Sequence, residues 1–331
     1  MTRIALVGCG KHTKDTLATY LKRLGQLEFE VCVDLVLDSA LAVQTELNAR
    51  SSANSVEAID ISKIDLAILA LPPGAAFEVA KYFIDRSVPC FVEKPPAAST
   101  ADIASLMQLA QSRSVYVQVG FNYRFADAVR VLHNQISANS EAGCILSIDF
   151  KSKHPSSSEW GVEGQLESWL RNNGIHAFDL LQWFSGKITK LSTGLFKGNE
   201  ARFIVTILAQ HSTGSISMLR IGNLTDRFDF RMTIHNTSSD QIHMPHLGEV
   251  IMEFRSGRLA GEILYRTRNL DNGWSRAGYG PELEYLISHY SEPHCSFSSL
   301  QDALVASELC DVTLNKLRKD NYKLLGRPEN Q

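Results

Sequence analysis

The chain has 331 residues, of which 44% are hydrophobic and 21% charged, and this length favours two domains over one. Its formal net charge of −3 lacks the basic footprint that phosphate backbones attract, so nucleic acid is not an expected partner. No apolar run approaches the ~18 residues that a membrane-spanning helix needs, so no membrane association is expected.

The first part of the chain alternates short apolar runs with stretches of helical periodicity. Residues 4–7 form an apolar run that ends in glycines, which suits a strand buried on both faces. Leucines at helical spacing follow, and Gly25 supplies a natural helix stop. This alternation predicts βαβ units and a parallel sheet. Further strands are expected at 29–33, 64–71, 89–92 and 115–121, with helices at 41–49, 75–85 and after a cap at Ser99 or Thr100.

The second part of the chain shows period-two alternation of apolar and polar side chains. Leu146, Ile148 and Phe150 alternate with polar residues, and the runs 203–207 and 228–234 do the same. Such alternation is typical of antiparallel strands with one covered face. We therefore expect a mostly antiparallel sheet here.

A glycine pair follows the first expected strand and opens the first expected helix. At such a turn, backbone N–H groups and the helix N-terminus can receive a pyrophosphate. Gly8 and Gly10 form the pair, and Thr13 in place of a third glycine implies a slightly displaced helix rather than a lost site. Asp34 ends the second strand, where its carboxylate could accept both ribose hydroxyls of NAD and repel the 2′-phosphate of NADP. The alternative is a solvated strand-end residue.

The predicted fold class is α/β with two domains. Residues 1–122 would form an NAD-binding Rossmann domain around the parallel sheet. Residues 123–331 would form a substrate-binding and oligomerisation α/β domain, with a large, mostly antiparallel open sheet and helices near 174–185 and 299–317. The C-terminal helix could pack back on the first domain.

Three short motifs fall in order along the chain. They are Glu93-Lys94-Pro95, residues 120–124 (Gly-Phe-Asn-Tyr-Arg) and residues 174–179 (Gly-Ile-His-Ala-Phe-Asp). Together they resemble the Gfo/Idh/MocA family of glucose–fructose oxidoreductases, inositol dehydrogenases and rhizopine catabolism proteins, over nearly the whole chain. The resemblance implies a Rossmann domain followed by an α/β domain whose open sheet builds homodimers or homotetramers.

The resemblance also implies roles for individual residues. Lys94 would lie beside the nicotinamide and the reacting oxygen, where an ammonium near a cationic ring exchanges protons readily. Glu93 would help to hold the cofactor. His176 would act as general acid and base, and Asp179, on the same helix face, would orient it. The cofactor contacts expected in all are Gly8, Cys9, Gly10, Lys11, His12, Asp34, Leu71, Pro72, Glu93, Lys94 and Asn122.

The chain departs from the family pattern just before His176. Asn172 stands where family dehydrogenases commonly carry an aspartate, and an amide can bind substrate but cannot accept a proton. Losing that carboxylate should lower the basicity of the histidine. Arg171 is a candidate anion clamp for a carboxylate or phosphate. The expected catalytic residues are Lys94, His176, Asn172 and Asp179, and the expected substrate contacts are Arg124, Trp160, Arg171, Asn172 and His176.

The leading hypothesis is hydride transfer between NAD(H) and a secondary alcohol or its ketone on a sugar, cyclitol or sugar nucleotide. One alternative is a thiazolinyl-type imine reductase, in which Asn172 is more tolerable because a protonated imine needs less help from a strong base. Another is a cofactor-binding sensor without turnover. A glycosidase that recycles NAD within the site is a further alternative.

Other residues carry weaker signals. His235, His243 and His246 lack the spacing of a tetrahedral ligand set, so no metal site is expected. The six cysteines are scattered without a C-x-x-C pair, and several lie in apolar runs, where a free cysteine behaves as a small hydrophobe. The N-terminus lacks the zones of a signal peptide. The scattered free cysteines predict a reducing, cytoplasmic setting.

Overall fold

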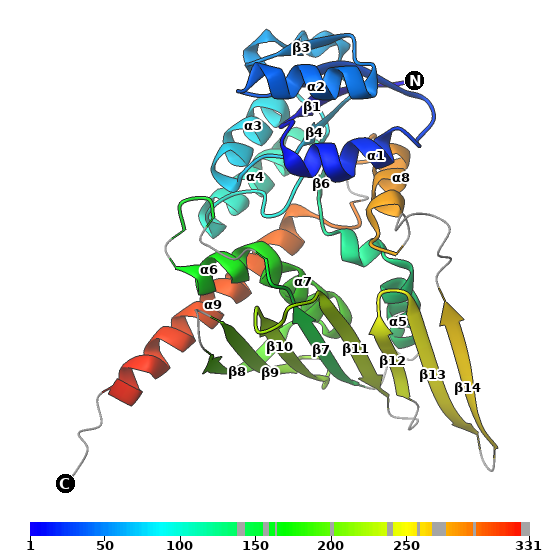
Figure 1. Cartoon of the computed structure of the whole chain (residues 1–331), viewed down its shortest axis with the longest axis vertical. Coiled ribbons are helices and arrows are strands. Elements are labelled where there is room, and N and C mark those ends of the chain that lie inside the picture. Colours follow the sequence, from blue (N-terminus) through cyan, green and yellow to red (C-terminus); the bar gives the residue numbers. More distant parts are fainter. Residues whose placement is uncertain are drawn as a thin grey trace. The chain divides into compact units, whose positions relative to one another are not determined.

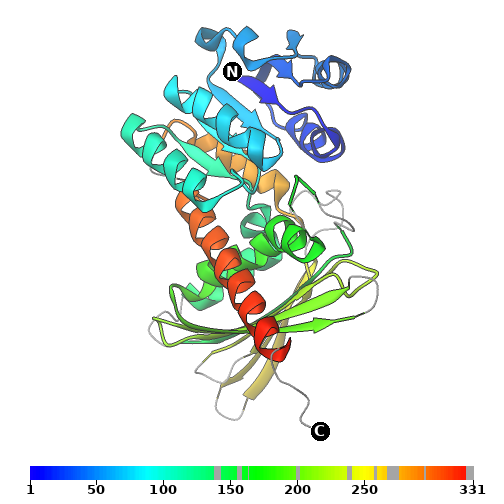
Figure 2. The same cartoon turned by 90° about the vertical axis from the view of Figure 1, so that its left-hand side faces the viewer.

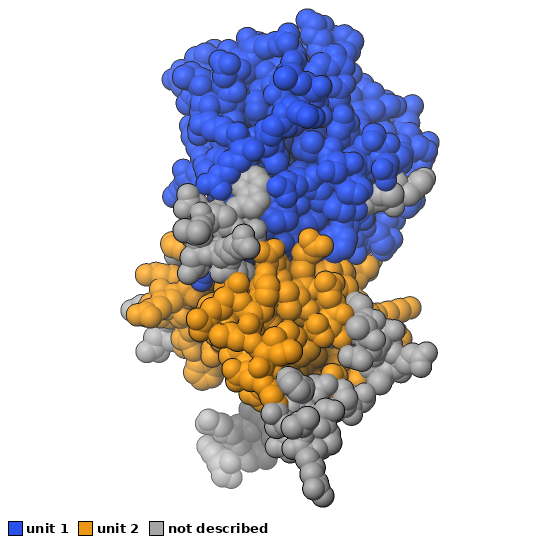
Figure 3. Space-filling view, turned by 90° about the vertical axis from the view of Figure 1, so that its right-hand side faces the viewer, with its two compact units in different colours: residues 1–125, 273–304 blue, residues 126–272, 305–331 orange. Residues whose placement is uncertain are grey.

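The computed structural model describes residues 1–137, 143–154, 159–162, 164–198, 202–236, 241–256, 259–266, 276–293 and 296–325 (Figure 1). The chain forms two compact units. The first comprises residues 1–125 and 273–304, and the second comprises residues 126–272 and 305–331 (Figure 3). None of the described helices is long and apolar enough to cross a membrane.

In the first unit, the described strands form a six-stranded parallel sheet in the order β3-β2-β1-β4-β5-β6. The parallel sheet predicted from strand–helix alternation is therefore confirmed. The strand order reverses between β1 and β4, and ligands of doubly wound sheets bind at the carboxyl ends of the strands at such a point. The strands are β1 (Thr2–Val7), β2 (Leu27–Val33), β3 (Ser51–Ala53), β4 (Leu66–Leu69), β5 (Cys90–Val92) and β6 (Val117–Val119).

The helices of the first unit begin and end at local signals. Ser99 precedes α4, and its Oγ accepts a hydrogen bond from the Asp102 N–H, which confirms one of the two predicted caps. Asn48 and Ser114 end α2 and α4 in the left-handed region, with φ of 53° and 52°. The helices are η1 (Thr13–Leu17), α1 (Ala18–Leu21), α2 (Leu37–Leu47), η2 (Val56–Ala58), η3 (Ile61–Lys63), α3 (Pro73–Asp85), α4 (Thr100–Arg113), η4 (Asn122–Phe125) and α8 (Tyr279–His289).

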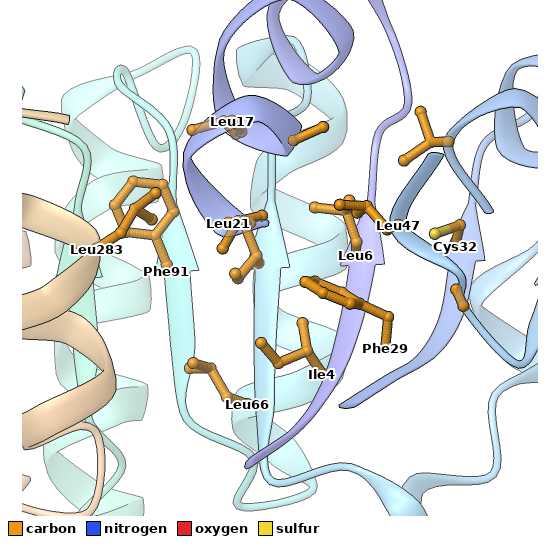
Figure 4. Close-up of a cluster of buried hydrophobic side chains, with 14 of the residues drawn as sticks. Ile4, Leu6, Leu17, Leu21, Phe29, Cys32, Leu47, Leu66, Phe91 and Leu283 are labelled. Carbon is orange, nitrogen blue, oxygen red and sulfur yellow. The ribbon is translucent and has the colours of Figure 1, made fainter. Parts of the chain in front are cut away.

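A cluster of buried apolar side chains holds the first unit together (Figure 4). Ile4 and Leu6 of β1 lie in it with Leu17 and Leu21 from the first helical stretch. Leu283 of α8 joins the same cluster although it is far away in the sequence. Burying a side chain of this size contributes about 2 kcal/mol, so α8 is anchored in the first unit.

The division of the chain differs from the expected boundary at residue 122, because residues 273–304 lie in the first unit. The Val119 N–H donates to the Ser298 carbonyl (2.8 Å), and the Ser298 Oγ donates to the Val119 carbonyl (2.7 Å). Strand β6 is at the edge of the sheet, where unpaired backbone groups need partners, and this returning segment supplies them. Such long-range pairing leaves no periodic signal in the local sequence.

In the second unit, the described strands form an eight-stranded sheet in the order β14-β13-β12-β11-β7-β10-β9-β8. Every pair is antiparallel except β7 with β10, which confirms the mostly antiparallel sheet. The strands are β7 (Ile145–Lys151), β8 (Ile188–Lys197), β9 (Phe203–His211), β10 (Ile216–Gly222), β11 (Asp229–His235), β12 (Gln241–His246), β13 (Glu249–Ser256) and β14 (Leu259–Arg266). The helices are α5 (Asp127–Ser137), α6 (Gln165–Trp169), η5 (Leu170–Gly174), α7 (Ile175–Ser185) and α9 (Leu300–Leu325, in this unit from residue 305).

The two faces of this sheet differ in what covers them. Helix α5 contacts β12 and β13, and α7 contacts β7 and β10 (Figure 2). Along β9, Val205 and Ile207 are buried, whereas Thr206 and Leu208 are exposed. The predicted alternation is therefore confirmed, and the face that carries Leu208 is open to solvent.

Candidate active site

The loop after β1 turns at a position where only glycine fits. Gly8 has φ of +91°, and a Cβ there would lie 2.2 Å from the carbonyl oxygen of Ala70 at the end of β4. Gly10 differs, because a Cβ at this position would meet no atom within 4 Å. Gly8 thus serves the packing of the loop, whereas the space around Gly10 suits the close approach of a ligand.

Thr13 occupies the place of a third glycine and holds the loop by its side chain. Its Oγ1 is buried and donates to the Gly8 carbonyl at 2.6 Å. Thr13 is also the first residue of the π-helix η1, which follows an α-helical start at residues 11–12. The loop therefore keeps its shape with a larger residue, and the adjustment is made in the first helical turn.

Asp34 is fixed at the end of β2 by two backbone donors. Its Oδ2 accepts the Cys9 N–H at 2.7 Å, and its Oδ1 accepts the Val36 N–H at 2.9 Å. A carboxylate has about four lone-pair sites, so each oxygen can still accept a hydroxyl. Asp34 is half-buried, and its carboxylate is oriented next to the glycine loop, while its contact with a cofactor stays a prediction.

Glu93, at the end of β5, is a buried carboxylate paired with a histidine. The Nε2 of His12 lies 3.0 Å from Glu93 Oε1. Burial by itself would raise the pKa of Glu93, but the charge and the hydrogen bond of His12 hold it below its usual value. Lys94 follows directly, half-buried, and the Lys94–Pro95 peptide bond is cis.

Tyr279 of α8 belongs to this group, although sequence reasoning missed it. Its ring centroid lies 5.8 Å from that of His12, and its ring stacks on Tyr20 at 5.9 Å. Burial raises its pKa well above the usual value, and the charge of Glu93 acts in the same direction. No local motif marks this tyrosine, because only the return of α8 to the first unit brings it here.

The remaining predicted cofactor residues of the first unit differ in accessibility. Lys11 and Pro72 are exposed, and Leu71 is half-buried beside Gly8. Asn122 is buried and donates from Nδ2 to the Ala277 carbonyl at 2.7 Å, which favours a structural role. Its contact with a cofactor stays a prediction.

Arg124 is buried and paired within the first unit, and its contact with substrate stays a prediction. The residue is 3% exposed. Its guanidinium donates to the Phe297 carbonyl at 2.9 Å and pairs with Asp302 at 3.1 Å. This pairing joins η4 to the start of α9.

In the second unit, the predicted catalytic residues share one helical stretch. His176 and Asp179 lie on α7 and are buried, with 5% and 2% of their surface exposed. Asn172 lies on η5 directly before this helix and donates from Nδ2 to Glu159 Oε2 at 2.6 Å. Residues four apart on a helix are neighbours on its surface, so Asn172 and His176 lie on adjacent turns.

Glu159 is the second residue that sequence reasoning missed. Its backbone N–H donates to the buried Ser168 Oγ at 2.9 Å, which fixes it beside α6. The structure thus brings a carboxylate to Asn172 from a loop. An acidic residue in a loop carries no signal of its own in a sequence, since most such residues are solvated.

Arg171 is paired within the second unit. Its guanidinium lies 2.8 Å from Glu167 and 2.8 Å from Asp311 of α9. Arg318 pairs with the same Glu167 (2.6 Å), so α9 is joined to α6 by a small charge network. This pairing favours a structural role over the predicted anion clamp.

The tryptophans have different surroundings. Trp160 is 40% exposed, so its side chain is accessible to a ligand. Its φ is +55°. Trp169 is buried and donates to the Ser152 carbonyl at 2.9 Å, and Trp183 stacks on His133 at 3.7 Å. Trp274 lies outside the described residues. Trp160 thus keeps its predicted place as a candidate substrate contact.

The sequence and the fold of this chain are similar to those of known oxidoreductases. The family model GFO_IDH_MocA, described as an oxidoreductase family with an NAD-binding Rossmann fold, matches residues 2–121. Residues 2–121 match this family. The predicted resemblance is therefore confirmed, and the glycine loop and Asp34 lie within the residues that match the NAD-binding Rossmann model.

The chain is similar in sequence to proteins named as dehydrogenases. An inositol 2-dehydrogenase of Arthrobacter sp. (strain FB24) is 26% identical over 204 residues, which cover 60% of this chain and 58% of that protein. The match thus spans little more than half of the relative. The fold is shared more widely, with a dehydrogenase from Chromobacterium violaceum (TM-score 0.87, 23% identity, 99% of both chains). It is also shared with a levoglucosan dehydrogenase solved with NADH (TM-score 0.83, 14% identity, 96% of this chain and 97% of that one).

Two histidines of the second sheet, His243 and His246, have hydrogen-bond partners within the protein. His243 Nδ1 lies 2.9 Å from Thr233 Oγ1, and His246 Nδ1 accepts the Gly248 N–H at 3.0 Å. Within the described parts of the chain, no group of three or more His, Cys, Asp or Glu side chains could hold a metal ion.

Proposed function

We propose that the protein is an NAD(H)-dependent oxidoreductase that moves a hydride to or from a secondary alcohol or its ketone on a sugar, cyclitol or sugar nucleotide. The observation that carries this proposal is the oriented carboxylate of Asp34 beside the open space at Gly10. The family match and the similarity to an inositol 2-dehydrogenase support it.

The residues present fit a dinucleotide. The backbone after Gly8 would receive the pyrophosphate, and the carboxylate of Asp34 would accept the hydroxyls of the adenosine ribose. Glu93, ionised by its pair with His12, would hold the nicotinamide half. The bound nicotinamide supplies the hydride chemistry, and the chain's own residues bind it, orient it and move the proton.

We assign the proton transfer to Lys94 and His176. Oxidation of an alcohol releases one proton as the hydride leaves, and a side-chain amine or imidazole in hydrogen-bond reach of the oxygen can accept it. Asp179 and Asn172 serve as positioning residues, since they share a helical stretch with His176. Burial of His176 and Asp179 limits the access of water to the transferred proton.

The variant Lys94→Ala tests the assignment. We expect it to abolish oxidation of inositols and sugars, while the dissociation constant of NADH stays within about tenfold of the wild-type value. Lys81→Ala, on the exposed side of α3, is the matched control and should retain turnover. Turnover that survives Lys94→Ala would remove this residue from the mechanism.

A cofactor-binding sensor is the second candidate. It is favoured by Asn172, because an uncharged amide bonded to Glu159 stands beside the turn that carries His176. Firm NADH binding without turnover on any alcohol, ketone or imine would favour the sensor over the enzyme.

We propose a homodimer as the working form, with a second copy of the chain on the open face of the second sheet. Exposed apolar residues on that face include Leu208 (48%) and Met218 (45%). A ladder of opposite charges crosses the same face, in which Asp149 pairs with Arg220 and Lys151 pairs with Asp229. A surface that carries both signs can meet a copy of itself about a two-fold axis.

A further inference from the structure

His12 joins the exposed start of the first helical stretch to a buried carboxylate. Its side chain is 41% exposed, whereas the side chain of Glu93 is 10% exposed, and their closest atoms lie 3.0 Å apart. A buried carboxylate is costly unless it is paired and hydrogen-bonded. The imidazole of His12 therefore pairs with Glu93 and can still exchange its proton with solvent.

Glu93 is confined on its other side as well. A Cβ at Gly120 would lie 2.8 Å from Glu93 Oε2, so the glycine makes room for this oxygen. One carboxylate oxygen thus lies against the backbone of Gly120 while the other meets His12. Small movements of Glu93 are restricted as long as the contact with His12 holds.

We propose that His12 is a positioning residue whose protonated ring holds Glu93 ionised and in place, and that this pair makes NAD(H) binding fall as the pH rises. The inference rests on the proposed cofactor site and concerns its regulation. In this proposal, His12 acts on the cofactor site through its contact with Glu93.

The charged and titratable groups that face His12 come from three elements. Glu93 and Lys94 follow β5, Asp15 lies on η1, and the phenol of Tyr279 lies on α8. Burial and Lys94 lower the pKa of His12, but Glu93 and Asp15 outweigh them and raise it above its usual value. The cation is therefore stabilised by the fold.

The direction of the pH effect follows from these shifts. The pKa of Glu93 is lowered and that of His12 is raised, so both partners are charged between the two values. As the pH rises through the raised pKa of His12, the ring loses its proton and the pair is lost. Glu93 then keeps a negative charge without this cation, near the place proposed for a dinucleotide that is itself an anion. Binding should weaken in that range.

The first experiment is an NMR titration of the imidazole protons in the whole chain without cofactor. The His12 signal, assigned from its loss in His12→Asn, should titrate at a lower pH in Glu93→Gln than in the wild type. The signal of His246, in the second unit, is the internal control and should be the same in both proteins. An unchanged midpoint for His12 would overturn the proposal.

The second experiment measures NADH affinity by fluorescence from about pH 6 to about pH 9. Wild-type affinity should fall about tenfold across this range, as expected for the loss of a charge-assisted hydrogen bond. His12→Gln keeps a donor but carries no charge, so its affinity should be weaker at the acidic end and nearly independent of pH. His246→Gln should retain the wild-type slope, and a His12→Gln profile that follows the wild type would contradict the proposal.

The two proposals fail in different ways. Absence of turnover with every substrate would reject the proposed reaction but leave the titration of His12 untouched. Conversely, turnover that depends on Lys94, together with a cofactor affinity that ignores the charge of His12, would reject only the role of His12.

Discussion

Single residues of the glycine loop have separable tasks. Gly8 is required by backbone conformation and by the contact with Ala70, whereas Gly10 leaves open space. Asp34 adds a carboxylate that two backbone N–H groups aim at the same region. Stability and ligand binding should therefore respond to different substitutions within a few residues.

The paired variants Gly8→Ala and Gly10→Ala test this separation. We expect Gly8→Ala to lower the free energy of unfolding by about 2 kcal/mol or more, because a Cβ at φ of +91° would clash with a carbonyl oxygen. Gly10→Ala should leave unfolding by urea nearly unchanged but weaken NADH binding. Equal stabilities for the two variants would contradict the assignment.

Asp34 should set the preference between the two nicotinamide dinucleotides. In the wild type, NADPH should bind at least about tenfold more weakly than NADH, because its 2′-phosphate meets a carboxylate. Asp34→Asn removes the charge and should reduce this difference, whereas Asp38→Asn, in the first turn of α2, should not. Fluorescence titrations with both cofactors measure the ratio, and an NADPH preference in the wild type would refute the role of Asp34.

At the scale of elements, the stretch from α6 through η5 to α7 carries the candidate residues of the second unit. Its π-helical segment presents Asn172 to Glu159 one turn before His176. π-helical segments within helices occur frequently at functional sites. The carboxylate that accepts from Asn172 belongs to Glu159, which precedes α6, and not to a residue of the helical stretch itself.

Asn172→Asp tests whether Glu159 provides that carboxylate. The new acid would face Glu159 across a contact that is now 2.6 Å, so like charges should lower the free energy of unfolding by about 1 kcal/mol at neutral pH. The repulsion raises the carboxyl pKa in the folded state, so the loss should disappear as the pH falls. Adding Glu159→Gln should restore neutral-pH stability, and a single variant as stable as the wild type would show that the contact is absent.

The sequence anticipated the elements whose signals are local. The apolar run of β1, the turn at Gly8 and the cap at Ser99 each lie within a few residues of the feature that they determine. Period-two alternation likewise predicted strands such as β9. These features depend on local backbone conformation and on which face of a strand is buried. Neighbouring residues determine both.

The sequence did not anticipate features that depend on distant contacts. Tyr279 reaches His12 only because α8 returns to the first unit, and Glu159 pairs with Asn172 although 13 residues separate them. Arg124 and Arg171 looked like ligand-binding cations, but carboxylates far along the chain pair with both. A charge in a motif does not reveal its partner.

At the scale of the whole molecule, one face of the second sheet is left uncovered by the described residues of its own unit. It combines exposed apolar side chains with alternating charges, among them Arg231 paired with Asp229 at 2.7 Å. A cavity of about 570 Å³ lies on the same face and is lined in part by Leu208 and Met218. A partner's side chains could fill such a hollow.

The variant Met218→Glu tests the proposed dimer. A carboxylate placed in an apolar contact is costly to bury, so the variant should elute and scatter light as a monomer where the wild type is a dimer. Val312→Glu changes a residue of equal exposure (45% for each) on α9 and should leave the dimer intact. A wild-type monomer at micromolar concentration would contradict the proposal.

The most direct test of the account is a crystal structure of the full chain with NADH. We predict that the adenosine ribose hydroxyls lie within hydrogen-bond distance of Asp34, that the pyrophosphate lies on the backbone after Gly8, and that Lys94 points to the nicotinamide. NADH bound elsewhere, or a Lys94 that points away from the ring, would contradict the central claim.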